Sequence, residues 1–356
     1  MSTPADTPAA PDDAPAPDPA PDAAASAGSA HHGGLHGVLD RFGAQNLILV
    51  LAILALGAFL TWQNPNFLMP GNLRTIGMAV TISGLLAVVQ TVMIILGGID
   101  ISVGSIAGLS SVSCALIFMA TENAAIAVLG TFVVGAACGL FNAMVVVFGR
   151  VTPMIATLAG LATFKGVAQL VSDGRAQGYT GADPFFKMLA RGSLAGIPTL
   201  VWVLVIVAVA VHIMLTYTTI GRNIYAIGGN DRAARLAGIN INRHIIAVFA
   251  LVGTVSALAG ILITARTGSG QPVSGSEGLE FASITAAALG GVALRGGKGS
   301  IGGTILAVIL LGILINGMTL LGVNPFWQNV AQGTLLVAAV IIQQLRSGER
   351  RVGLPK

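Results

Sequence analysis

The feature that most constrains this chain is the length of its stretches without charge. Residues 299–345 form a run of 47 residues without Asp, Glu, Lys or Arg, and 75–99 and 123–149 are further such runs. Across the chain 54% of the residues are hydrophobic and 9% are charged, whereas soluble domains carry about 25% charged residues. A helix crosses the hydrocarbon with about 20 apolar residues, and the apolar run 200–210 lacks the alternation of barrel strands. The sequence therefore predicts an all-α polytopic membrane protein.

About ten spanning helices account for these stretches. An even number places both termini on the same side, and Lys and Arg gather in the cytoplasmic segments of membrane proteins. With the termini inside, the inner segments hold 12 of these bases and the outer segments hold five. We therefore expect both termini to be cytoplasmic. The predicted spans are 45–62, 75–96, 101–119, 124–148, 152–171, 199–217, 244–265, 280–294, 301–321 and 327–345.

The two ends of the chain differ from its body. Residues 1–30 hold five Asp and seven Pro but no Lys or Arg, a composition that cannot bury a core. They lack the basic start and apolar centre of a signal peptide. We predict a disordered, acidic, Pro/Ala-rich cytoplasmic tail at 1–40, a transmembrane domain at 41–346 and a cytoplasmic tail at 347–356.

Motifs of an enzyme or a metal site are missing from the sequence. The five His residues have no ligand spacing, and Cys114 and Cys138 lie in apolar runs, as buried thiols do. Gly296-Gly-Lys-Gly-Ser300 resembles a phosphate-binding loop, but Gly299 stands where Ser or Thr must follow Lys298. The bases are scattered among connections, which argues against nucleic acid as a partner. We expect no catalytic residue and no metal ligand.

Asp100 is the one charged residue between Arg74 and Glu122. A carboxylate at membrane depth is costly unless it is paired, hydrated or protonated. Two interpretations stay open at this point. Asp100 lies either in a short cytoplasmic turn, where it caps the next helix, or in a site within a broken helix.

The segment 218–243 is a long inner loop with four of the bases. Asn230 or Asp231 can cap a short helix over 231–237, and Gly238 can end that helix in a left-handed conformation. A capped, basic helix between two spans indicates a surface that docks on a soluble partner. A merely solvated turn is the alternative.

Four stretches together resemble the permease subunits of bacterial ABC importers, specifically the ribose/xylose-type sugar permease family. They are 96–105, 142–158, 221–239 and 289–304, and the resemblance covers about 45–345. It implies ten spans in the bacterial inner membrane, a cytoplasmic ABC ATPase, a periplasmic sugar-binding protein and a second permease copy, with a homodimer expected and a heterodimer as the alternative. The chain itself is expected to bind no cofactor, because ATP and Mg belong to the ATPase.

The resemblance also assigns residues to two tasks. The ABC coupling signature Glu-Ala-Ala-x-x-x-Gly is matched by Ala233, Ala234 and Gly238, whereas Arg232 stands in the place of Glu. The predicted ATPase-coupling residues are Gly221, Arg222, Asn230, Asp231, Arg232, Ala233, Ala234, Arg235 and Gly238. A neutral sugar needs groups that match hydroxyls, and the predicted transport-pathway residues are Gln90, Asp100, Ser102, Asn142, Thr157 and Asn316.

The predicted function is import of a pentose, hexose or related polyol, powered by the separate ATPase. An ABC permease for branched-chain amino acids has a similar architecture, but the sequence offers no clear charge pair for a zwitterion. An ion-coupled carrier keeps ionisable groups within its spans, where only Asp100 and Lys165 qualify. A structural scaffold is a third alternative, but that role would not explain why Pro and Gly interrupt the spans.

Overall fold

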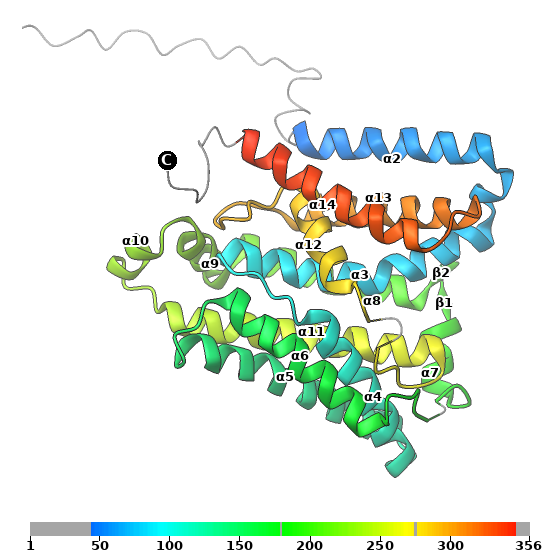
Figure 1. The fold of residues 1–356 in the computed structure, drawn as a ribbon, viewed down its shortest axis with the longest axis horizontal. Coiled ribbons are helices and arrows are strands. Elements are labelled where there is room, and N and C mark those ends of the chain that lie inside the picture. The colour runs from blue at the N-terminus through cyan, green and yellow to red at the C-terminus, as the bar shows by residue number, and fades with distance from the viewer. Residues whose placement is uncertain (1–43, 179, 274–275, 347–356) are drawn as a thin grey trace, which may run out of the picture. The chain divides into compact units, whose positions relative to one another are not determined.

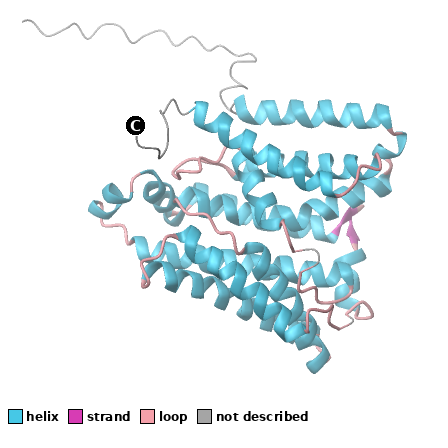
Figure 2. Cartoon of the chain, viewed as in Figure 1, coloured by secondary structure: helices cyan, strands magenta, loops and turns pink. Residues whose placement is uncertain are grey.

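The computed structural model describes residues 44–178, 180–273 and 276–346. Within these ranges the named elements are helices and one short hairpin (Figure 1, Figure 2). The predicted tails 1–40 and 347–356 lie outside the described residues. The elements are α2 (Ala44–Gln63), η1 (Pro65–Leu68), α3 (Pro70–Leu96), α4 (Val103–Thr121), α5 (Ala124–Val147), α6 (Pro153–Ser172), α7 (Pro184–Arg191), β1 (Ser193–Leu194), β2 (Ile197–Pro198), α8 (Thr199–Tyr217), α9 (Thr219–Gly229), α10 (Asp231–Leu236), α11 (Ile241–Thr267), α12 (Leu279–Leu289), α13 (Ile301–Leu320) and α14 (Phe326–Arg346).

Each predicted span coincides with a helix, and the predicted fold class is confirmed. Eight helices in the described ranges are long and apolar enough to cross a membrane, namely α2, α3, α4, α5, α6, α8, α11 and α13. α14 is not among them; Gln and Asn side chains interrupt its apolar sequence. α12 has 11 residues, about 16 Å at 1.5 Å per residue, which is half the hydrocarbon thickness. The span predicted at 280–294 was too long, because the chain leaves the helix at Gly290 and Gly291 adopts a φ of 87°.

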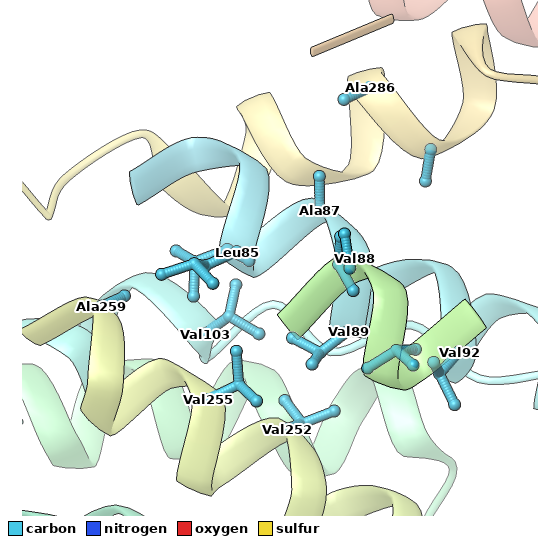
Figure 3. Close-up of a cluster of buried hydrophobic side chains, with 14 of the residues drawn as sticks. Leu85, Ala87, Val88, Val89, Val92, Val103, Val252, Val255, Ala259 and Ala286 are labelled. Atoms are coloured by element: carbon cyan, nitrogen blue, oxygen red, sulfur yellow. The ribbon is translucent and has the colours of Figure 1, made fainter. Parts of the chain in front are cut away.

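Helix α3 is the centre of the packing. Its side chains from Leu85 to Leu96 are all buried, and it runs between the group α2, α12, α13 and α14 and the group α4, α5, α6 and α11 (Figure 1). Figure 3 shows Val89 and Val92 of α3 on the side of Val252 in α11, with Ala87 on the side of Ala286 in α12. Small side chains such as Ala87 and Ala286 let the backbones approach closely, and such packing contributes to helix association in lipid.

Two helices begin inside the bundle. After α3, the extended segment 97–102 leads back between the helices, and Asp100 within it is fully buried. The N-terminal end of α4 then packs on the connection before α12, where a side chain at Gly104 would lie 2.7 Å from the Ser276 carbonyl oxygen. Interrupted helices that meet at membrane depth are typical of transporters.

The two ends of the bundle carry different elements. At one end, residues of α9 and α10 lie beside the end of α3 and the starts of α6 and α11. At the other end, the start of α3 lies beside the β1–β2 hairpin, in which Ser193 pairs with Pro198. Next to this hairpin, α7 buries Phe186 and Leu189 and leaves Met188 exposed.

Candidate coupling and transport sites

The predicted loop 218–243 contains two helices, whereas the sequence predicted one. The first is α9, which starts where the Thr218 hydroxyl accepts a hydrogen bond from the Gly221 N–H at 3.2 Å. Gly221, Ile224 and Ile227 recur every three residues and are buried. Each glycine in a helix costs about 1 kcal/mol relative to alanine, so the three glycines of α9 hid this helix from the sequence. Packing of its apolar face outweighs that cost.

The second helix, α10, is the predicted coupling helix. Asn230 caps it by accepting from the Ala233 N–H at 3.0 Å, and Gly238 follows it with a φ of 82°. Both predicted ends of the helix are therefore confirmed. Leu236, which the sequence analysis did not select, is 91% exposed at the end of α10. α10 thus presents one apolar side chain beside two Arg residues.

The structure divides the nine predicted coupling residues by position. Ala234 is only 4% exposed and Gly221 is buried, so both face their own chain. Asn230 and Gly238 shape the turns at the ends of α10. The other five side chains are exposed, namely Arg222, Asp231, Arg232, Ala233 and Arg235. Contact of these residues with an ATPase stays a prediction.

A junction of glycines joins α9 to the bundle. The N–H of Gly297 donates to the Ile95 carbonyl at 2.8 Å. A side-chain carbon at Gly228 would lie against that same carbonyl and 2.6 Å from the Gly297 nitrogen. The Tyr225 hydroxyl donates to the Gly299 carbonyl at 2.8 Å. α9 is thus in direct contact with the end of α3 and with the connection that leads into α13.

Three of the predicted pathway residues meet around the segment 97–102. One oxygen of the Asp100 carboxylate accepts from the Ser102 N–H at 2.7 Å and from the Ser102 hydroxyl at 2.6 Å. The Gln90 side-chain amide on α3 pairs with the backbone of Asp100 when its nitrogen faces the Asp100 carbonyl. In this orientation the amide nitrogen donates to that carbonyl at 3.0 Å, and the amide oxygen accepts from the Asp100 N–H at 3.2 Å. The Asp100 carboxylate is fully buried between α3 and α4, which favours a site within a broken helix over a short cytoplasmic turn, and a role in transport stays a prediction.

Two more predicted residues complete this network. Asn142 of α5 donates to the Ser102 hydroxyl at 2.8 Å. The Thr157 hydroxyl of α6 accepts from the Ile101 N–H at 3.2 Å and lies 3.3 Å from the Ile99 carbonyl, to which it donates. All five side chains are fully buried. In this conformation they hold the segment 97–102 in place, and their contact with a substrate stays a prediction.

We predict that Ser102→Ala destabilises the permease through this network. The change removes the hydroxyl that bonds both Asp100 and Asn142, and a buried polar group that loses its partner costs about 1–3 kcal/mol. Ser110 is a matched control, because its buried hydroxyl has no hydrogen-bond partner among the described residues. Thermal unfolding of the detergent-solubilised protein should show a lower midpoint for Ser102→Ala than for Ser110→Ala. Equal midpoints would contradict the assignment of the network.

Asn316, the sixth predicted pathway residue, lies elsewhere. It forms a reciprocal amide pair with Asn72 of α3, at 3.0 Å and 2.9 Å. It also lines a cavity of about 260 Å³ between α3, α12, α13 and α14. The six predicted residues thus belong to two places, five in a buried network and one at a cavity. Within the network, one Asp100 carboxylate oxygen and the Asn142 amide oxygen have no hydrogen-bond partner among the described residues.

Lys165 has a partner as well. Its ammonium group lies 2.9 Å from the Glu277 carboxylate, in an ion pair between α6 and the connection before α12. Both side chains are partly exposed. The span residue that could serve ion coupling is therefore engaged in this conformation.

Comparison with known proteins agrees with this architecture. The family model described as the permease component of branched-chain amino acid transport systems matches residues 72–340. The ribose import permease protein RbsC of Escherichia coli strain K12 is 39% identical over 295 residues, which are 82% of this chain and 92% of RbsC. RbsC of Bacillus subtilis strain 168 is 37% identical over 87% of this chain and 95% of its own length. The L-arabinose permease AraH of E. coli K12 is 36% identical over 88% and 93%.

The helical bundle with interrupted helices and the match over most of the chain define a membrane transport protein. The chain belongs to this family of ABC-importer permeases, as the resemblance of its four stretches predicted. It is a multi-pass protein of the bacterial inner membrane and a transporter subunit, not an enzyme.

Proposed function

We propose that the chain is the transmembrane subunit of an importer that moves a monosaccharide into the cytoplasm, driven by a separate ABC ATPase and supplied by a periplasmic binding protein. The relatives named above are permeases for ribose and for L-arabinose, which are both neutral pentoses. The observation that carries the proposal is α10, a capped basic helix with an exposed Leu236 at one end of the bundle.

The orientation that this function needs places α9 and α10 in the cytoplasm. Seven Lys and Arg residues with described side chains belong to segments at the α10 end, and five belong to the opposite end. This excess supports cytoplasmic termini under the positive-inside rule. The two sets are Arg150, Arg222, Arg232, Arg235, Arg243, Arg295 and Lys298 at the α10 end, and Arg74, Arg175, Lys187, Arg191 and Arg266 at the other end.

We predict that Leu236→Cys reacts with a membrane-impermeant maleimide only when the cytoplasmic face is accessible. Met188→Cys, at the opposite end of the bundle, should react only in intact cells freed of their outer membrane. Both native side chains are more than half exposed, whereas the native Cys114 and Cys138 are buried. Labelling of inverted vesicles and of spheroplasts distinguishes the two faces. Labelling of Leu236→Cys from outside would reverse the orientation.

The contacts of α9 suggest how a movement of α10 reaches the bundle. α10 follows α9 directly, and α9 contacts the end of α3 at Gly228 and the start of the α13 region through Tyr225. A shift of α10 toward a closing ATPase would therefore displace both α3 and α13. These are two of the helices around the cavity at Asn316.

ATP-driven uptake in proteoliposomes tests the proposed function. With the ATPase and the binding protein present, radiolabelled ribose or arabinose should enter only when ATP is supplied. An ion-coupled carrier would instead take up the sugar in response to a proton gradient without ATP.

A further inference from the structure

The cavity at Asn316 is lined mainly by one face of each of three helices. Its lining residues on α3 are spaced by four, from Thr75 to Ser83, and those on α13 follow the spacing of one helix face. α12 contributes three residues and α14 contributes one. The lining residues are Thr75, Ala79, Ser83, Leu279, Ala282, Ala286, Val308, Leu311, Gly312, Ile315, Asn316, Thr319 and Gln332.

The cavity extends from the α7 end of the bundle toward its middle. Thr75 lies near the start of α3, and Ser83 lies eight residues further on, which is about 12 Å along the helix axis. On α13, Thr319 is the penultimate residue, and Val308 lies 11 residues before it. This separation is about 16 Å along the helix axis. The deep end lies beside α12, the half-length helix that begins inside the bundle.

The polar groups of the cavity are neutral and suited to hydroxyls. The Thr75 and Thr319 hydroxyls donate to carbonyls of their own helices, at 3.0 Å in both cases. The Thr319 oxygen also accepts from the Gln328 amide at 3.0 Å, so the Thr75 lone pairs and the second lone pair of Thr319 are the groups left to bind a donor. Asn316 is held in position by Asn72, and Gln332 adds a second amide. Sugar hydroxyls donate and accept hydrogen bonds, and the apolar remainder of the wall suits the ring carbons.

Size and charge narrow the class of ligand. Pockets for small molecules usually measure about 300–1,000 Å³, and this cavity of about 260 Å³ lies just below that range, which favours a single sugar ring over a disaccharide. None of its lining residues is charged, so it offers no counter-charge to the ammonium and carboxylate groups of an amino acid.

We infer that this cavity is the permease's own binding site for a monosaccharide in transit. The inference rests on the proposed function and deepens it, because it locates the sugar within one chain, between α3, α12 and α13. Sugar released at the α7 end enters beside Thr75 and Thr319 and passes toward α12. Displacement of α3 and α13 through α9 then changes the shape of the site.

Ala79→Trp tests the inference by filling the cavity from an exposed position on α3. In proteoliposomes with the ATPase and the binding protein, uptake of radiolabelled ribose and L-arabinose should fall at least about tenfold, the effect of about 1.4 kcal/mol. ATP hydrolysis stimulated by the sugar-loaded binding protein should persist. Ala137→Trp is the matched control, because Ala137 is exposed on α5 and does not line the cavity. Uptake at the level of this control would overturn the inference.

Cysteine protection supplies a second measurement that does not depend on turnover. Ala79→Cys should react with a small water-soluble thiol reagent, and millimolar ribose, but not L-leucine, should slow the reaction. A rate that sugar does not change, or protection by leucine alone, would contradict a sugar site. If the wild-type complex itself shows no ATP-dependent uptake of either sugar, the proposed function fails, whereas a failure confined to the Ala79 variants refutes only the site.

Discussion

Leu236→Asp should abolish most ATP-driven uptake while the permease stays folded and inserted. Leu236 is 91% exposed, so the change removes no packing within the chain. If α10 docks on the ATPase, burial of this leucine at the interface contributes about 1.5–3 kcal/mol, and a carboxylate in its place must also be desolvated. Because 1.4 kcal/mol corresponds to a factor of about ten, we expect uptake to fall at least about tenfold and ATPase to dissociate from the permease.

Leu236→Met is the control for this experiment, since it keeps an apolar side chain of similar reach. Uptake and co-purification of the ATPase should be close to those of the wild type. Equal uptake by Leu236→Asp and Leu236→Met would show that the tip of α10 is not a contact surface. Ala234→Glu would be less informative, because Ala234 is buried and the larger side chain would disturb this chain's own packing.

Gly228→Val should impair both the stability of the α9 junction and transport. Its side chain would collide with the Ile95 carbonyl and with the Gly297 nitrogen, which are backbone atoms and cannot turn away. Overpacking of this kind typically costs about 1–3 kcal/mol. The hydrogen bond from Gly297 to Ile95 would also be strained. We expect a lower thermal midpoint and a loss of uptake.

Gly229→Ala is the matched control at the neighbouring position. Nothing lies within 4 Å of a side-chain carbon there, and alanine favours a helix by about 1 kcal/mol over glycine. This variant should keep wild-type uptake and equal or higher stability. If Gly228→Val matched it in both measurements, the contact between α9 and α3 would have no part in coupling.

The spanning helices were predictable from the sequence because charge is excluded from lipid-exposed segments. The ends of α10 were predictable for a similar local reason, since Asn230 and Gly238 are cap residues with conformations of their own. α9 was missed because its three glycines disfavour a helix in isolation. The early end of α12 was missed because an apolar sequence continues past Gly290.

The grouping of the polar residues could not be predicted. Gln90, Asn142 and Thr157 lie on three different helices, and only the packing of α3, α5 and α6 brings them to the segment that holds Asp100 and Ser102. Asn316 is the same residue type as Asn142, yet α13 places it at the cavity beside Asn72. The sequence showed which polar residues lie within the spans, whereas the packing of the helices determines which of these residues meet.

The most direct test of the account is uptake by proteoliposomes that contain the permease, its ATPase and its binding protein. With ATP present and no ion gradient, radiolabelled ribose or L-arabinose should accumulate, and L-leucine should not. Removal of ATP, or replacement of the permease by its Leu236→Asp variant, should stop the accumulation. Uptake of leucine under these conditions, or sugar uptake driven by a proton gradient without ATP, would contradict the account.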